Sequence, residues 1–188
     1  MSVVVAIKEN DTIYLGADTL MARKNTKVPE INNIEKFKLT NLPNGIILGH
    51  VGGVSTTQKL VLNEEWFIGV EEKGLDKEFL VTVILPKLKE ELEKYKLLDE
   101  DGMMDADFLI AYKDRLYDIK SDFSVVKINE HTAIGAGKNF ALSISCKDYV
   151  DKQEKLIEAL RHSSKMCSSV DGPFVLIDTK TLEFAIKN

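Results

Sequence analysis

The sequence predicts an α/β (α+β) chain built as a four-layer α/β/β/α sandwich, with two antiparallel sheets packed together and helices on their outer faces. Two observations predict this fold. Short apolar segments separated by turn residues are typical of antiparallel strands, and two pairs of helical segments interrupt the series of strands. Because each helix must bury an apolar face, helix pairs inserted between groups of strands favour layers outside two sheets.

The chain opens with a predicted β-hairpin. Residues 3–7 carry little polar surface, as in a strand that is buried on both faces. A Glu-Asn-Asp turn follows, and residues 12–17 return as the second strand, with Asp18 at its end. We expect a polar loop rich in Lys and Asn after this hairpin.

Two further strands are expected at residues 34–40 and 45–51, around a turn that contains Pro and Gly. Gly52 and Gly53 close the second of these strands. The region therefore predicts another antiparallel pair that ends in two glycines.

Helices are predicted in two pairs. Ser55 and Gln58 fit a capping box, which predicts a helix over residues 56–70. A second helix should begin near Lys77, and Pro86 should kink or restart it. The remaining elements are short strands, a second helix pair and a closing hairpin. They are expected at residues 108–112, 116–119, 125–128 and 132–135, then 140–146 and 152–166, and finally 174–178 and 182–186.

Size and charge restrict the class of protein. The 188 residues carry a net charge of -5 with both signs interspersed, which argues against nucleic acid or an anionic membrane as a partner. The longest strongly apolar stretch, residues 79–85, is far shorter than the roughly 20 residues needed to cross a bilayer. Only Cys146 and Cys167 are present, and no secretory signal pattern is found. We therefore expect one cytoplasmic domain, residues 1–188.

Ser2 is the first candidate for chemistry. Met1 precedes a small residue, which is the usual condition for removal of the initiator, and removal would leave Ser2 with a free α-amine. Such an amine titrates near pKa ~8, so it can accept a proton from the hydroxyl of its own residue. The alternative is an ordinary serine that follows the initiator methionine.

Five segments, in this order and spacing, share a pattern with a known family. They are residues 2–18, 33–39, 49–53, 133–137 and 159–167. Together they resemble the peptidase subunits of the proteasome family, the proteasome β-subunits and the bacterial HslV-type peptidase that works beside a ring ATPase. The resemblance covers nearly the whole chain and places Ser2 at the N-terminal threonine of the family.

This resemblance implies an N-terminal nucleophile hydrolase fold and a threonine/serine-type endopeptidase that cleaves peptide bonds through a Ser2 acyl-enzyme. Lys36 would be the cation that keeps the α-amine unprotonated. Asp18 would hold that lysine charged and oriented. Gly52 would donate a backbone amide to the oxyanion. The resemblance implies no cofactor and no metal.

The resemblance also implies how substrate binds. A peptide or unfolded protein would add as an extended strand between Ala22 and Gly53, with His50 and Val54 as candidate pocket residues. The family's assembly implies a homo-oligomeric ring with an ATP-driven unfoldase as a possible partner.

Two departures from the family pattern leave alternatives open. Ala136 stands where the family has a serine between two glycines, and no acid precedes Asp171 near the end of the penultimate helix. Ser164 or Ser168 could take over the missing contacts. The first alternative is a catalytically weakened or inactive proteasome-like scaffold. The second is an N-terminal nucleophile amidase that acts on a small molecule.

Overall fold

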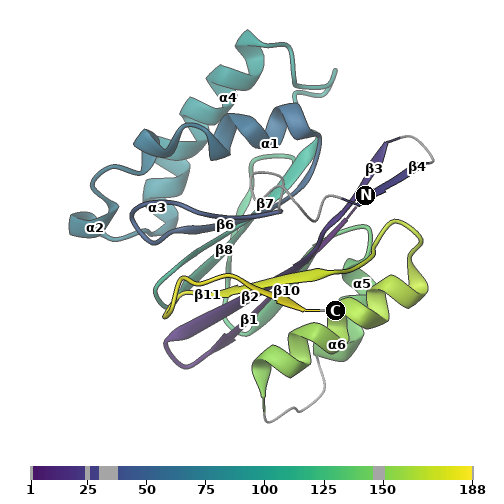
Figure 1. Cartoon of the computed structure of the whole chain (residues 1–188). Helices are drawn as coiled ribbons and strands as arrows, with labels where there is room; N and C mark the ends of the chain where they lie inside the picture. Colours follow the sequence, from purple (N-terminus) through teal and green to yellow (C-terminus); the bar gives the residue numbers. More distant parts are fainter. Residues whose placement is uncertain (1, 24–25, 30–37, 146–150, 188) are drawn as a thin grey trace.

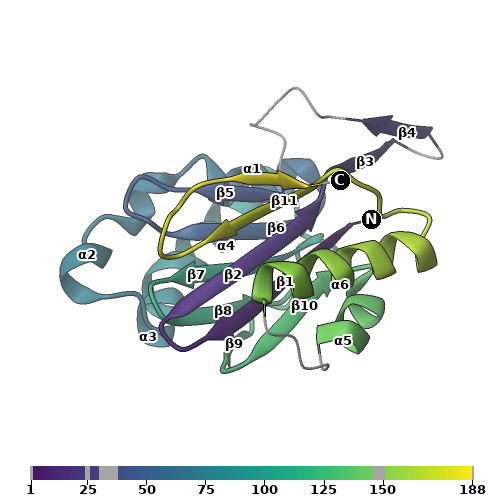
Figure 2. The same ribbon diagram turned by 60° about the horizontal axis from the view of Figure 1, so that its bottom comes forward.

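Two five-stranded antiparallel sheets pack face to face and are covered on their outer faces by helices (Figure 1). The computed structural model describes residues 2–23, 26–29, 38–145 and 151–187. This arrangement confirms the predicted α/β/β/α sandwich. The two turned views show the helix layers on opposite sides of the paired sheets (Figures 1 and 2).

The first sheet contains both ends of the chain. Its order is β10 (His131–Gly135), β1 (Val3–Glu9), β2 (Thr12–Asp18), β11 (Phe174–Asp178) and β12 (Ala185–Lys187). The predicted opening hairpin is confirmed, with Val5 opposite Gly16. Strand β2 also pairs with β11, so Asp18 lies opposite Phe174.

The second sheet is formed by the middle of the chain. Its order is β5 (Leu39–Asn41), β6 (Ile47–Gly52), β7 (Ala106–Tyr112), β8 (Arg115–Ile119) and β9 (Val125–Ile128). Apolar side chains of both sheets, among them Val4, Leu15, Ile47 and Leu109, form the core between them. These strands are therefore buried on both faces, as their uninterrupted apolar sequences predict.

The outer layers form two further apolar cores. Helices α5 (Lys138–Ser145) and α6 (Lys152–Met166) cover the first sheet and pack on Val3 and Val5. The second sheet is covered by α1 (Val54–Val61), α3 (Lys77–Phe79), the π-helix η3 (Leu80–Ile84) and α4 (Leu85–Lys94). Pro86 lies in the first turn of α4, which confirms the expected restart.

The prediction for the first helix is wrong in two respects. The chain forms α1, then the 3₁₀ helix η2 (Glu64–Phe67) and α2 (Val70–Lys73), in place of one helix over residues 56–70. The helix begins after Gly53, which makes no side-chain cap, so the capping box expected at Ser55 does not form. Gly69 has a left-handed backbone with φ of 88°, which interrupts the helical pattern.

The expected polar loop after Asp18 is a second correction. Residues in it form the antiparallel hairpin β3 (Leu20–Arg23) and β4 (Thr26–Pro29), which extends away from the sandwich in both ribbon views (Figures 1 and 2). The two strands pair with each other across a short connection. They can therefore form without the alternation of apolar and polar residues by which strands are recognised in a sequence.

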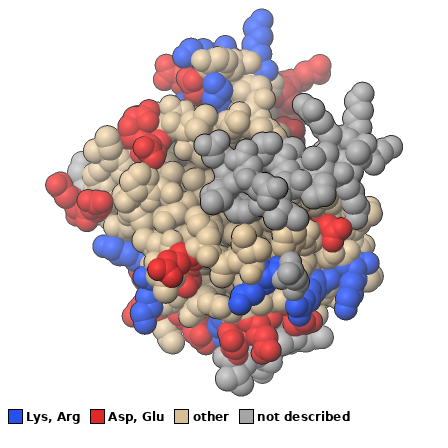
Figure 3. Space-filling view, viewed as in Figure 1, with Lys and Arg blue, Asp and Glu red and all other residues tan. Residues whose placement is uncertain are grey.

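Charged side chains of both signs lie around the margin of the face shown in Figure 3, and a largely uncharged area lies between them. Among the helices of the described residues, none is long and apolar enough to cross a membrane.

Candidate active site at the N-terminal end of β1

Ser2 lies at the start of β1, and the peptide unit that follows it is held from two sides. The Val3 N–H donates to Asp18 Oδ1 at 2.8 Å, and the Gly137 N–H donates to Ser2 O at 3.3 Å. Ser2 is only 7% exposed. The fold therefore buries the candidate nucleophile beside the carboxylate that the sequence assigns to the same site.

Asp18 is fully buried at the end of β2 and pairs with a lysine. Lys38 Nζ lies 2.6 Å from Asp18 Oδ2, and it also donates to Leu20 O at 2.8 Å. Burial raises the pKa of the Asp18 carboxyl, whereas Lys38 and the Val3 amide lower it by stabilising the charged form. Asp18 thus connects a cation to the backbone beside Ser2.

Lys36, the lysine expected at this position, lies outside the described residues. Lys38 is the residue that the sequence reasoning missed. The two lysines are two positions apart, so in an extended strand they share a face and alternation does not separate them. The register of the β5–β6 hairpin could have identified Lys38. The 42–46 turn sets the pairing of these strands, and this pairing places Lys38 beside His50, whose N–H donates to Lys38 O at 2.9 Å.

Gly52 ends β6 in a backbone conformation that requires glycine. Its φ is 115°, and a Cβ at this position would lie 2.2 Å from Asp105 O. The next amide, of Gly53, donates to Asp105 O, just before β7. Since amides alternate along a strand, the Gly52 amide faces away from β7.

Gly135 connects the two halves of the site. A Cβ on Gly135, whose φ is 91°, would lie 2.3 Å from Ser2 O and 3.1 Å from Val51 Cγ1. The backbone of residue 2 and the residue before Gly52 therefore contact the same glycine. The fold brings Ser2, Asp18 and the Gly52 loop together from β1, β2 and β6.

The four predicted substrate-binding residues lie in three different elements of the fold. Ala22 lies in β3, where it pairs with Lys27, and its side chain is outside the described part. His50 is half-buried in β6, opposite Phe108. Gly53 and Val54 begin α1 and line a pocket, and the Val54 side chain is exposed.

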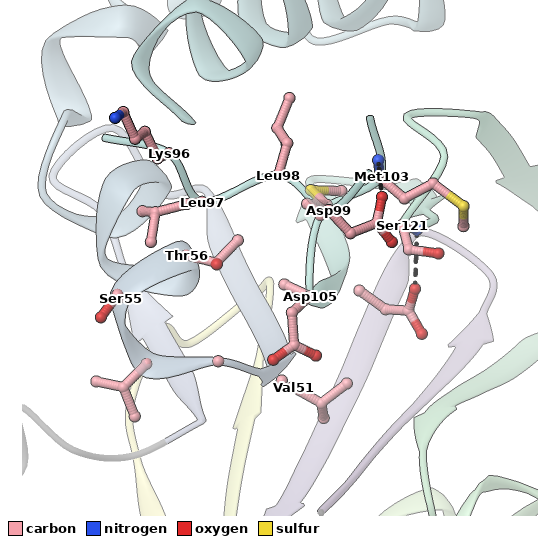
Figure 4. Close-up of a pocket in the computed structure, with 16 residues that line it drawn as sticks. Val51, Ser55, Thr56, Lys96, Leu97, Leu98, Asp99, Met103, Asp105 and Ser121 are labelled. Atoms are coloured by element: carbon pink, nitrogen blue, oxygen red, sulfur yellow. Dashed lines mark hydrogen bonds between the residues drawn. The ribbon is translucent and has the colours of Figure 1, made fainter. Parts of the chain in front are cut away.

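This pocket, of about 880 Å³, lies beside the Gly52–Gly53 turn (Figure 4). Its wall includes Asp99, Asp105 and Asp107 and extends from the start of α1 to Ser121. Two of the carboxylates hold backbone amides: Asp99 Oδ1 accepts from Met103 N at 2.8 Å and Asp107 Oδ1 from Ser121 N at 3.1 Å. Ser2, Asp18 and His50 are not part of this lining.

The two serines expected to replace the missing family contacts do not reach residue 2. Ser164 Oγ donates to Asp171 Oδ1 at 3.4 Å, and Ser168 is exposed. Ser163 is instead the buried serine here, and its hydroxyl donates to Gly137 O at 3.2 Å. Ser163 lies four residues after Ala159, so both residues are on the buried face of α6. This helical spacing in the sequence could have identified Ser163 as the inward-facing serine.

The described residues contain no group of three or more His, Cys, Asp or Glu side chains that could hold a metal ion. Asp18 has a lysine partner in place of further acidic or imidazole ligands. The arrangement supports proton transfer and charge stabilisation by side chains and backbone amides.

No family model matches the sequence, and no curated protein matches it. Solved structures do match its fold. Thiobacillus denitrificans BPH has a TM-score of 0.76 at 18% identity, over 94% of this chain and 96% of that one. Eukaryotic HslV from Trypanosoma brucei has a TM-score of 0.68 at 15% identity, over 94% and 98%. Anbu, an ancestral beta-subunit from Yersinia bercovieri, has 0.73 at 14%, over 98% and 86%.

These matches confirm the recognition of a proteasome-like, N-terminal nucleophile hydrolase fold. The likeness extends over nearly the whole chain, in agreement with the spread of the five sequence segments. Identities of 14–18% establish the fold alone.

Proposed function

We propose that this chain is a proteasome-like endopeptidase in which Ser2, freed of Met1, is the nucleophile. The observation that carries the proposal is the link from Ser2 to a buried ion pair. The amide that follows Ser2 donates to Asp18, whose other oxygen lies 2.6 Å from Lys38 Nζ. A cation held beside a terminal amine disfavours protonation of that amine, so the amine is available as a base.

The proposed reaction has two steps. Ser2 Oγ attacks the scissile carbonyl while its proton passes to the Ser2 α-amine, directly or through a water molecule. Collapse of the tetrahedral intermediate breaks the C–N bond, the proton moves to the leaving amine, and an ester to Ser2 remains. Water then hydrolyses this ester and restores the hydroxyl.

Lys38 takes the role that the family resemblance gives to Lys36. Asp18 holds Lys38 from one side and Leu20 O from another, which fixes the ammonium group. The Gly52 amide, which faces away from β7, is proposed to stabilise the oxyanion. Removal of one such donor typically costs ~10² to 10³ in rate.

Peptide substrate is proposed to bind extended between the backbone of Ala22 in β3 and that of Gly53. Ala22 lies in a hairpin that has two strands within the described residues, so an added strand is proposed to pair at the outer edge of β3. Val54 borders the pocket beside Gly53 and His50 lies two residues before Gly52, so both are proposed as residues that contact substrate side chains.

The proteasome-like fold also supports a homo-oligomeric ring in the cytoplasm, with a ring ATPase as a possible partner. One neighbour is named a beta-subunit, which is consistent with assembly. Native mass spectrometry should show a multimer well above the 21.1 kDa chain. A strict monomer at micromolar concentration would favour the small-molecule amidase.

The direct test is covalent labelling. Intact mass should first show loss of Met1. Incubation with a peptide β-lactone should then add one intact probe, and tandem mass spectrometry should locate it on Ser2. Ser2→Ala should abolish both labelling and peptide cleavage with an unchanged circular dichroism spectrum, whereas Ser2→Thr should retain them because hydroxyl and amine are preserved. Labelling at Cys167 with a fully active Ser2→Ala variant would exclude the proposal.

One observation favours the inactive scaffold as a second candidate. Ala136 lies between Gly135 and Gly137 beside residue 2, where it offers no hydroxyl to the α-amine. If Met1 is removed and neither cleavage nor Ser2 labelling occurs with a candidate ATPase present, the scaffold is the better assignment.

A further inference from the structure

A chain of buried hydrogen bonds connects α6 to residue 2. Ser163 Oγ donates to Gly137 O at 3.2 Å, and the Gly137 N–H donates to Ser2 O at 3.3 Å. Both polar groups of Gly137 are therefore used: its N–H contacts Ser2, and its carbonyl accepts from Ser163 of α6 and also from the Ala141 N–H of α5 at 3.1 Å. The Ser163 side chain is fully buried, so water does not compete for its hydroxyl.

Gly137 packs against its neighbours without space for a side chain. A Cβ at this position would lie 3.0 Å from Val3 Cβ, 3.0 Å from Val170 Cγ2 and 3.3 Å from Ser163 Cβ. The backbone of Gly137 thus contacts β1 and α6 directly. A shift of Gly137 would therefore move the N–H that donates to the Ser2 carbonyl.

The Ser2–Val3 peptide unit is held at both of its polar atoms. Its carbonyl accepts from Gly137, and its N–H donates to Asp18. Because a peptide unit is planar, these two contacts fix its orientation. Rotation about the Ser2 Cα–C bond then remains as the backbone torsion that aims the amine and hydroxyl.

Ser145 shows which of the Ser163 contacts is unusual. A helical serine commonly donates to the carbonyl four residues earlier. Ser145 in α5 does this with Ala141 O at 3.0 Å, and Ser163 in α6 does it with Ala159 O at 2.9 Å. The single hydroxyl proton of Ser163 is therefore shared between Ala159 O and Gly137 O. Both serines are buried, but within the described residues only Ser163 also reaches a carbonyl next to residue 2.

We propose that Ser163 is a positioning residue for the Ser2 nucleophile, acting through Gly137. It orders the carbonyl side of the Ser2–Val3 peptide unit, while Asp18 orders the amide side. This role lies at a place where Ala136 supplies no hydroxyl. The inference rests on the proposed function, because it assigns Ser163 to the reaction of Ser2.

The test compares Ser163→Ala with the matched control Ser145→Ala in the full chain. We expect kcat for peptide cleavage to fall between about tenfold and about a hundredfold in Ser163→Ala, with KM unchanged, because misplacement of reacting groups is costly. The rising limb of its pH-rate profile should move to higher pH as the amine leaves the Lys38 field. Its Gly137 amide should exchange hydrogen faster. Ser145→Ala should change none of these quantities.

Equal effects of the two alanine variants, or an unchanged kcat and pH profile in Ser163→Ala, would overturn the inference. Should Ser163→Ala not fold, Ser163→Cys carries the same comparison, because a thiol has a similar shape and is a weaker donor. If the wild type neither cleaves peptides nor reacts with a peptide β-lactone, the proposed function fails. Exchange at Gly137 then decides the ordering role: faster exchange than in Ser145→Ala supports it, and equal exchange overturns it.

Discussion

Two buried aspartates, one in each sheet, have a lysine at the same distance, yet they differ in what else they contact. Lys38 Nζ lies 2.6 Å from Asp18, and Lys120 Nζ lies 2.6 Å from Asp118. Burial raises the pKa of both carboxyls. The same pair of residue types therefore occurs twice in this fold.

The difference lies in connectivity and exposure. Asp18 joins segments that are distant in sequence, since it accepts from Val3 and pairs with Lys38, whose side chain is 12% exposed. Asp118 pairs with a lysine two residues along the chain, whose side chain is 37% exposed, and its one distant contact is a longer hydrogen bond of 3.4 Å from the Thr132 hydroxyl. Each aspartate has one buried oxygen, Asp18 Oδ2 and Asp118 Oδ1, that makes no hydrogen bond within the described part of the chain, so this feature does not separate them. A hydrogen bond to the backbone that follows Ser2, the proposed nucleophile, distinguishes the candidate site, whereas burial of an ion pair does not.

The largest expected effect follows from removing each lysine. Lys38→Ala should lower peptide cleavage near neutral pH by about 10² to 10⁴-fold, the usual contribution of a general base. Loss of the nearby positive charge raises the pKa of the Ser2 amine, so the rising limb of the pH-rate profile should move upward. Lys120→Ala should leave kcat unchanged. Equal rates for Lys38→Ala and wild type across the pH series would remove Lys38 from the mechanism.

Lys38→Arg sharpens the same comparison. A planar guanidinium cannot occupy the compact position between Asp18 Oδ2 and Leu20 O, so the substitution should not restore cleavage although the charge is retained. Lys120→Arg is the control, because its side chain can extend into solvent. Full activity of Lys38→Arg, measured beside circular dichroism, would show that charge alone is sufficient.

Stability should separate the two aspartates as well. Asp18→Asn leaves the mostly buried Lys38 without its counter-charge, which we expect to lower the free energy of unfolding by about 3 kcal/mol. Asp118→Asn should lower it by about 1 kcal/mol or less, because Lys120 reaches water. Urea titration of the two variants measures this difference, and losses of equal size would contradict the assignment.

The smallest expected effect is a pH dependence. Because the pKa of Asp118 is raised from 3.8, the folded state retains this proton longer than the unfolded state. The contribution of Asp118 to stability should therefore decrease as pH rises from about 4 to its folded-state pKa, and stay level above it. Subtracting the urea curves of Asp118→Asn from those of wild type isolates this contribution. A difference that grows with pH would have the wrong sign.

Much of the fold could be predicted because its elements are apolar and local. Residues 152–166 and 174–178 form a helix and a strand with the predicted bounds, as their spacing and capping residues indicate. The β3–β4 hairpin was missed because each strand has only four residues, Leu-Met-Ala-Arg and Thr-Lys-Val-Pro, which is too short to show a clear alternating pattern. The helix start at Val54 was misplaced because the Gly53 N–H donates to Asp105 O just before β7, a contact that no local capping pattern reveals.

The candidate site was predictable only in part. Ser2 and Asp18 are fixed by the spacing of one hairpin, so the sequence places them together. The pairing of Asp18 with Lys38 depends on the register of β5 against β6, which follows from the 42–46 turn and cannot be read from the lysines themselves. Ser163 is similar, because its partner Gly137 lies 26 residues away.

The burial of Ser2 sets the order of events in making this protein. A methionine aminopeptidase needs access to the first two residues as an extended chain, but the folded protein holds Ser2 at 7% exposure with its peptide unit bound on both sides. On the proposed function we therefore expect methionine removal to come before β1 docks between β2 and β10. An affinity tag fused ahead of Ser2 would leave an amide where the proposed function requires an amine, so an assay of the proposed peptidase needs its tag at the other terminus.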